Sequence, residues 1–118
     1  MTAPHLARGA RGEDLAAEWY RRHGYEVVAR NWRCCTPDVV GEIDIIALGP
    51  GVLVVCEVKS RAGDGFGGPA AAVDHRKQSR LRRLAVAWLA AHRPGAVQIR
   101  FDVATVVGDD LTMIVAAF

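Results

Sequence analysis

The sequence is poor in the residues that build disulfide frameworks and thiol or imidazole metal sites. Its three cysteines, Cys34, Cys35 and Cys56, are an odd number, and none forms a CxxC pair. We therefore expect structural thiols in a reducing compartment. The four histidines show no metal-ligand spacing, so each is expected at the surface or at a helix end.

Long apolar runs are also missing. No stretch approaches the ~20 apolar residues that a membrane-spanning helix requires, and residues 1–12 contain no apolar signal core. These features predict a cytoplasmic protein without a membrane partner. We expect residues 1–11 to form a flexible arm. Residues 12–118 are expected to form a single domain, because 118 residues leave no comfortable room for a second core.

The overall charge excludes little. The net charge of +2 permits a nucleic-acid partner without arguing for one. The hydrophobic fraction of 51% and the charged fraction of 24% are ordinary for a globular domain. The placement of charges along the chain is therefore more informative than their sum.

Hydrophobic spacing and turn residues predict the element order α-β-β-β-α-β-β. Apolar residues at helical spacing predict a first helix at 12–23, with Gly24 as its C-cap. Residues 34–40 are expected to form a loop. The other predicted elements are strands at 25–32, 42–48 and 52–60, a helix at 70–92, and strands at 97–107 and 111–116. This order indicates an α/β sandwich in which helices flank a mixed sheet.

The clearest hairpin signal joins the second and third predicted strands through a Gly-Pro-Gly turn at 49–51. If the turn is centred on its last two residues, Asp44 lies directly across from Glu57, and Lys59 shares their face. Directly opposed residues have Cβ atoms ~5 Å apart. The two carboxylates are therefore predicted to meet in a partly buried place.

Such a pair of carboxylates points to a metal site. Facing acids repel each other, and a divalent cation relieves the repulsion. Oxygen ligands with bound water suit Mg²⁺ or Mn²⁺, which polarise a phosphoryl oxygen and acidify water. Asp44 and Glu57 are thus candidate metal ligands, and Lys59 is a candidate to orient the water. The alternative is a solvated Glu57–Lys59 pair on an exposed strand, with Asp44 as a surface acid.

Two further residues are candidates for the same site. Lys77 falls on the apolar line of the second predicted helix, where a lysine either snorkels to solvent or serves a site. Glu13 lies in the opening turn of the first helix. There it either complements the helix macrodipole or supplies a third acid.

Arginines recur on the second predicted helix. Such a run is either a solvated face or a set of phosphate contacts. The candidate nucleic-acid-binding residues are Arg30, Arg33, Arg61, Arg76, Arg80 and Arg83.

The segment 63–68 fits the GxGxxG pattern of dinucleotide-binding loops. However, Pro69 follows it directly, and no acid-tipped strand follows about 20 residues later. We therefore expect no nucleotide cofactor, and we interpret the segment as a flexible loop beside the site.

The candidate residues lie in motifs that occur together elsewhere. The central motifs are GEIDIIA at 41–47 and EVKSR at 57–61. The others are Gly12-Glu13, Arg30-Asn31-Trp32-Arg33, Phe66-Gly67, Lys77, Arg100-Phe101-Asp102-Val103 and Ala117-Phe118. Together they resemble the PD-(D/E)xK nuclease superfamily and, more narrowly, the YraN-like family of small bacterial proteins.

The resemblance implies a restriction-endonuclease-like fold related to archaeal Holliday-junction resolvases. It also implies a Mg²⁺-dependent endonuclease acting on DNA, including branched or otherwise structured DNA. Asp44 and Glu57 would then ligate the metal, Lys59 would assist the attacking water, and Glu13 would be an additional acid. The resolvase analogy favours a homodimer, because two symmetric cuts need two sites. One departure is the 34–40 link, which looks longer than the family's usual link.

Two other functions stay open at the level of sequence. A non-catalytic DNA-binding module would keep the fold and the charges without turnover. An interaction subunit would use the apolar end of the chain, residues 111–118, as a pairing edge.

Overall fold

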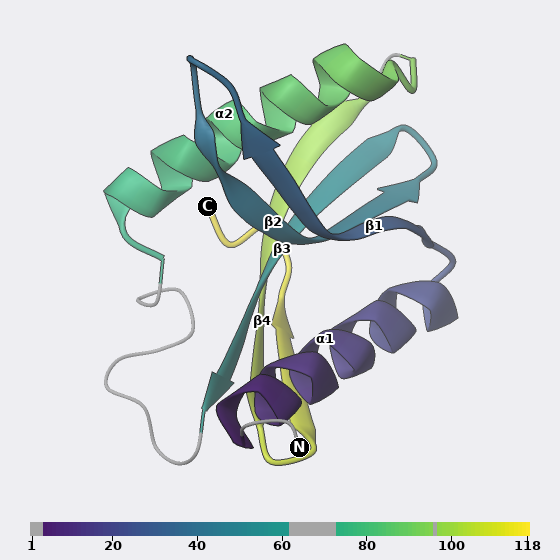
Figure 1. Ribbon diagram of the computed structural model, residues 1–118. Coiled ribbons are helices and arrows are strands. Elements are labelled where there is room, and N and C mark those ends of the chain that lie inside the picture. Colours follow the sequence, from purple (N-terminus) through teal and green to yellow (C-terminus); the bar gives the residue numbers. More distant parts are fainter. Residues whose placement is uncertain (1–3, 62–72, 96) are drawn as a thin grey trace.

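The computed structural model describes residues 4–61, 73–95 and 97–118, and its elements follow the predicted order (Figure 1). The two helices are α1 (Pro4–Arg22) and α2 (His75–His92). The strands are β1 (Glu26–Cys35), β2 (Val40–Gly49), β3 (Val52–Arg61), β4 (Gln98–Val107) and β5 (Asp110–Ile114). In this part of the chain neither helix has the length and apolarity needed to cross a membrane.

The five strands form one mixed sheet in the spatial order β1-β2-β3-β4-β5. Neighbouring strands are antiparallel except for β3 and β4, which run parallel from Val52 opposite Gln98 to Arg61 opposite Val107. Parallel neighbours need a long crossover connection, and α2 lies within that connection. The predicted mixed sheet is therefore confirmed.

A helix covers each face of the sheet, as expected for an α/β sandwich of the restriction-endonuclease-like kind (Figure 1). On one face, α1 contributes Ala16, Ala17 and Tyr20 to a core with β2, β3 and β4. On the other face, α2 contributes the apolar side chains Leu81, Leu84, Ala85 and Trp88. Strands covered on both sides explain the nearly continuous apolar runs of β2 and β3.

The turn between β2 and β3 has the register that the sequence predicts. Gly49 pairs with Val52, and the ladder continues to Ile45 opposite Cys56, where it ends. Asp44 and Glu57 are the next residues on the two strands. The Asp44 side chain accepts a hydrogen bond from the Val58 backbone N–H at 2.8 Å. We call this place, where β2 and β3 separate at Asp44 and Glu57, the fork.

The first helix is longer than predicted. It begins at Pro4, so residues 4–11, which were expected to be a flexible arm, are helical. Proline suits the first position of a helix, because its missing N–H needs no partner there. Gly9 and Gly12 interrupt the apolar spacing, which is why the pattern concealed this part of the helix.

The predicted loop at 34–40 is shorter in the structure, because strands occupy both of its ends. β1 continues to Cys35 and β2 begins at Val40, so a tight turn of residues 36–39 joins them. The Thr36 backbone N–H donates to the Val39 carbonyl oxygen at 3.0 Å, which closes the turn. The link is therefore a hairpin turn of residues 36–39, shorter than the loop predicted for residues 34–40.

The second helix begins later than predicted. Asp74 is its N-cap, and its side chain accepts a hydrogen bond from the backbone N–H of Lys77 at 2.9 Å. The helix ends at His92, and its C-cap, Arg93, adopts the left-handed conformation just before Pro94. The interpretation of segment 63–68 as a loop lies outside the described residues.

Candidate active site at the fork

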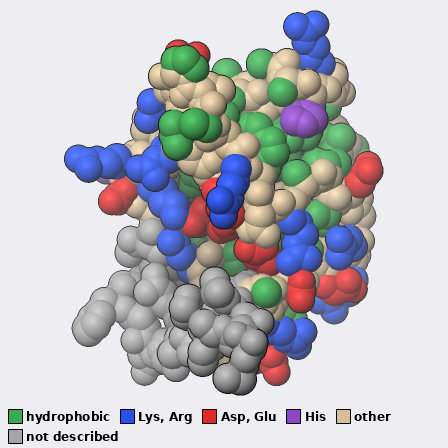
Figure 2. Space-filling model, viewed as in Figure 1, with side chains coloured by type: hydrophobic (Ala, Val, Ile, Leu, Met, Phe, Trp, Pro, Cys, Tyr) green, Lys and Arg blue, Asp and Glu red, His purple; other side chains and the backbone are tan. Residues whose placement is uncertain are grey.

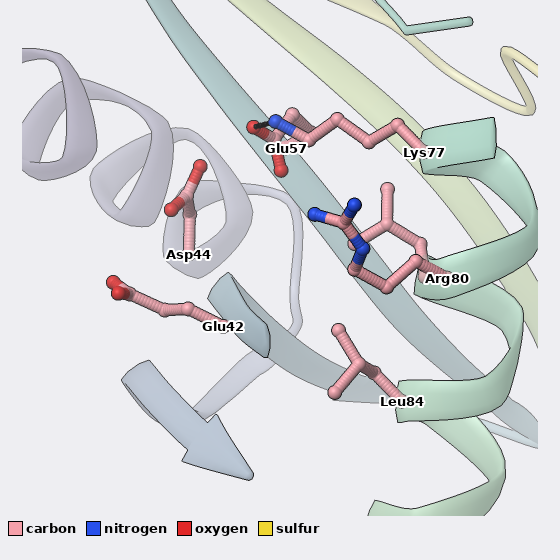
Figure 3. A pocket seen from close by; sticks show the side chains of 7 residues that line it. Glu42, Asp44, Glu57, Lys77, Arg80 and Leu84 are labelled. Carbon is pink, nitrogen blue, oxygen red and sulfur yellow. Dashed lines mark hydrogen bonds and ion pairs between the residues drawn. The ribbon is translucent and has the colours of Figure 1, made fainter. Parts of the chain in front are cut away.

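The fork lies beside a cavity of about 260 Å³ between β2, β3 and α2. The lining residues are Glu42, Asp44, Glu57, Lys77, Arg80, Leu81 and Leu84. Figure 3 shows the carboxylates of Glu42 and Asp44 on one side of this cavity and the side chains of Lys77 and Arg80 on the other. Acids from two strands and cations from a helix therefore meet in one concave place.

Asp44 is an acid of the cavity with a strongly raised pKa. Burial, and then the neighbouring charge of Glu57, raise the pKa of Asp44 from 3.8 to about 7, although the hydrogen bond from Val58 opposes the rise. Glu13 and Glu42 add to the increase. A buried carboxyl surrounded by other acids is energetically costly, so its position calls for a compensating cation or proton.

Glu57 is almost fully buried, with 5% of its surface exposed. Its Oε1 atom accepts a hydrogen bond from Nζ of Lys77 at 2.5 Å. The Nζ atom of Lys59 lies 3.5 Å from the same oxygen. Both lysines are therefore directed to the same oxygen of the carboxylate, and Lys77 is paired with an acid of the cavity instead of only extending into solvent.

The two lysines differ in their electrostatic surroundings. Burial and the neighbouring Lys77 lower the pKa of Lys59, and Glu57 opposes this shift. Burial acts in the same direction on Lys77, but its hydrogen bond and charge interaction with Glu57 outweigh burial and raise its pKa. Lys77 is thus the firm partner of Glu57, and Lys59 is the more readily deprotonated of the two.

Glu13 approaches the fork from the α1 side. Its carboxylate accepts a hydrogen bond from the Asn31 side chain at 2.9 Å and lies 3.5 Å from Arg30. A close approach of α1 makes this possible: a Cβ atom on Gly12 would lie 2.4 Å from Oγ of Ser60. The negative charge of Glu13 therefore acts on Asp44 and contributes to its raised pKa.

The structure separates the predicted nucleic-acid-binding arginines into groups. Arg30 and Arg33 lie on β1 and form ion pairs, Arg30 with Glu13 and Asp14, and Arg33 with Glu42. Arg76, Arg80 and Arg83 all lie exposed on α2. Arg61 ends β3, and its side chain lies outside the described part of the structure. Figure 2 shows Lys and Arg side chains gathered where α2 begins in Figure 1, next to acidic side chains.

Sequence analysis gave no role to a second buried acid. Asp102 on β4 is fully buried and receives two hydrogen bonds from Arg100, at 2.9 Å each. Tyr20 and the Ala116 backbone N–H also donate to it, at 2.6 and 2.9 Å. The charged residues Arg100 and Asp102, which lie on one face of a mostly apolar strand, were the available signal. These four donors make Asp102 a fully satisfied structural acid.

The chemistry of the fork fits a magnesium ion. Within the described residues, no group of three His, Cys, Asp or Glu side chains is arranged to hold a metal. Mg²⁺, however, is commonly bound by one or two carboxylates and completes its shell with water and substrate phosphate. In the described part of the chain, Oδ1 of Asp44 and Oε2 of Glu57 have no hydrogen-bond partner. These two oxygens are available to such an ion.

Comparison with known proteins identifies the family. Residues 12–106 match the uncharacterised protein family UPF0102. The chain belongs to the UPF0102 family. A UPF0102 protein of Nocardia farcinica is 51% identical over 100 residues, which cover 85% of this chain and 76% of the relative. A UPF0102 protein of Acidothermus cellulolyticus is 46% identical over 110 residues, with 85% and 80% covered.

A UPF0102 protein of Beutenbergia cavernae is 49% identical over 100 residues, which cover 85% of this chain and 81% of the relative. The matched region, residues 12–106, begins one residue before Glu13 and includes the fork and α2. The YraN-like identity expected from the motifs is therefore confirmed, and every predicted site residue lies within the matched region.

Proposed function

We propose that this UPF0102 protein is a metal-dependent endonuclease that hydrolyses phosphodiester bonds of DNA. The observation that carries the proposal is the pair of carboxylates at the fork, Asp44 and Glu57. They stand at neighbouring positions on two strands, Glu57 is buried and Asp44 is half-buried, and the pKa of Asp44 is raised to about 7. Perturbed acids that face a cavity are more typical of functional sites than of structural ones.

Asp44 and Glu57 would hold Mg²⁺ or Mn²⁺ through Oδ1 and Oε2. When bound there, the metal supplies polarisation of a phosphoryl oxygen and acidification of water. Lys77 holds Oε1 of Glu57, so that Oε2 is left for the ion. Lys59, whose pKa is lowered by burial, would orient the attacking water.

The proposed reaction is the hydrolysis of a phosphodiester bond by water. The water oxygen bonds to phosphorus, and the bond from phosphorus to one ester oxygen breaks. A proton passes from the water through solvent to the departing oxygen. The products are a phosphate monoester and a free hydroxyl. The motifs of this chain resemble a nuclease superfamily that is related to Holliday-junction resolvases. We therefore propose branched DNA as the substrate form and a homodimer that makes two cuts.

The experiment is a cleavage assay on junction, flap, single-stranded and duplex DNA with Mg²⁺ or Mn²⁺. We expect metal-dependent cleavage of at least one substrate. Asp44→Asn and Lys59→Ala should reduce it by about 100-fold or more, as is typical when a group that stabilises the transition state is removed. Cleavage that persists in both variants would reject the assignment of the site.

One observation favours a second candidate, a non-catalytic DNA-binding module. The charge of Glu57 is already compensated by Lys77 and Lys59 without any metal. This module would bind DNA with a steep salt dependence, cleave none of the four substrates, and bind equally well after Asp44→Asn. The same assay, with a binding measurement added, separates the two functions.

A further inference from the structure

The cations around the cavity are not equivalent. Lys59 and Lys77 are both directed at Oε1 of Glu57, at 3.5 and 2.5 Å. Glu42 is paired with Arg33 at 3.4 Å. The two lysines therefore already interact with a carboxylate of the chain and are not free to bind an added anion without breaking that contact.

Arg80 is different. It lines the cavity together with three carboxylates, yet it forms no ion pair or hydrogen bond with any described side chain. In Figure 3 its guanidinium group points from α2 into the space in front of Glu57 and Asp44. A guanidinium group presents donors in a planar fork that matches the oxygens of phosphate.

The backbone around Arg80 is shaped to hold its side chain against the sheet. A Cβ atom on Gly41 would lie 3.2 Å from Cδ of Arg80 and 3.0 Å from Cδ1 of Leu84. The missing side chain at Gly41 therefore lets the stem of Arg80 lie against β2. The fully buried Leu84 and the nearly buried Leu81 anchor the same turn of α2.

From these observations we propose that Arg80 binds the non-bridging oxygens of the internucleotide phosphodiester that is cleaved at the fork. The phosphodiester would lie between the guanidinium group and the carboxylates of Asp44 and Glu57. This inference rests on the proposed function, but it assigns the residue that recognises the phosphate group itself. Arg76 and Arg83, which lie outside the cavity lining, would contact the flanking DNA backbone.

The first test compares Arg80→Ala and Arg80→Lys with Arg76→Ala, which removes the same charge one turn earlier on α2. We expect Arg80→Ala to lower kcat by about 100-fold, as for loss of one preorganised donor. Arg80→Lys, which keeps the charge without the planar fork, should fall between the wild type and Arg80→Ala. Arg76→Ala should raise KM. Its fold-reduction in kcat should be at least tenfold smaller than that of Arg80→Ala. Equal effects of Arg76→Ala and Arg80→Ala on kcat would overturn the inference.

A second measurement does not depend on turnover. Binding of the dinucleotide dTpdT is followed by NMR of the arginine side chains, with its uncharged methylphosphonate analogue as the control ligand. We expect dTpdT to shift the Arg80 Nε–H resonance, and we expect the analogue to bind at least fivefold more weakly. Equal binding of the two ligands, or an unshifted Arg80 resonance, would reject the role of Arg80.

Metal binding separates failure of this inference from failure of the proposed function. Mn²⁺ titration by calorimetry should give the same affinity for Arg80→Ala and the wild type, because Arg80 is not a ligand. Loss of Mn²⁺ affinity in Arg80→Ala would show that Arg80 supports the fork instead of the phosphate. Absence of cleavage by the wild type, together with dTpdT binding through Arg80, would reject the nuclease and retain the phosphate site.

Discussion

Asp44 is the residue whose placement is hardest to explain by stability alone. Its carboxyl is half-buried beside Glu57 and near Glu13 and Glu42, and its pKa rises to about 7. Glu57, by contrast, has Lys77 as a close partner. Residues placed at a cost to the folded state are common in functional sites, where binding of a ligand compensates for the cost. Asp44 therefore carries the strongest argument for a site at the fork.

The cost predicts an unusual pH dependence. The folded chain holds the Asp44 proton more tightly than the unfolded chain, whose carboxyl has a pKa near 3.8. The contribution of Asp44 to stability is therefore fully present below about pH 4 and is lost as the pH rises through about 7. Asp44→Asn, which keeps an oxygen to accept from Val58, should be more stable than the wild type at pH 8, by on the order of 3 kcal/mol.

Urea unfolding in EDTA at pH 5 and pH 8 measures this difference. The advantage of Asp44→Asn should shrink at pH 5, where most of the wild-type Asp44 is protonated. Addition of Mg²⁺ at pH 8 should then stabilise the wild type and leave Asp44→Asn unchanged. If Asp44→Asn were the less stable protein at pH 8 without metal, the ionised carboxylate of Asp44 would not destabilise the folded state, which would contradict this prediction.

The geometry of the fork depends on how closely α1 and α2 approach the sheet. Gly12 allows α1 to pass directly over Ser60, and Gly41 allows α2 to lie against β2. Asp74 caps the first turn of α2, the turn that presents Lys77 to Glu57. Helix positions therefore bring Glu13 and Lys77 to the fork from opposite faces of the sheet.

Gly12→Ala tests the approach of α1. The added methyl group would lie 2.4 Å from Oγ of Ser60, so the Ser60 side chain must rotate or α1 must move away from β3. We expect a loss of about 1–3 kcal/mol of stability, as for other overpacked positions. A movement of α1 also takes Glu13 away from Asp44. The raised pKa of Asp44 should then fall, and NMR titration of its carboxyl would show this change.

A double-mutant cycle controls for a simple loss of helix stability. Removing the Ser60 hydroxyl in Gly12→Ala/Ser60→Ala should restore part of the stability lost in Gly12→Ala. Additive effects of the two substitutions would contradict the steric explanation.

Local sequence signals predicted the fork well and its surroundings less well. The Gly-Pro-Gly turn and strand alternation sufficed to place Asp44 next to Glu57, because the register between β2 and β3 follows from three consecutive residues. The contact of Lys77 with Glu57 spans 20 residues and depends on how α2 packs. The hydrogen bond from Tyr20 to Asp102 spans 82 residues, and no local pattern reports such a contact.

At the scale of the molecule, a net charge of +2 conceals a segregation of charge. The α2 helix carries Lys77 and four arginines, and it has no acidic residue in its first turn. The acids of the fork face the first turns of this helix (Figure 3). A basic helix beside an acidic cavity is the arrangement expected when a protein contacts the phosphates on either side of the one at its active site. Such a protein can have a modest total charge.

This segregation predicts which arginines govern DNA affinity. Each phosphate contact that is lost lowers the slope of log K against log salt concentration by about 0.9 for duplex DNA. Arg76→Gln/Arg83→Gln should therefore reduce the slope by about 2. The matched control is Arg21→Gln/Arg22→Gln, which removes two exposed charges at the end of α1 and should leave the slope unchanged. Binding is measured by fluorescence anisotropy from 50 to 300 mM salt, in EDTA so that no cleavage occurs. Equal slopes for the two double variants would place the DNA away from α2, because the surface of α2 would then contribute no more than any other basic region of the molecule.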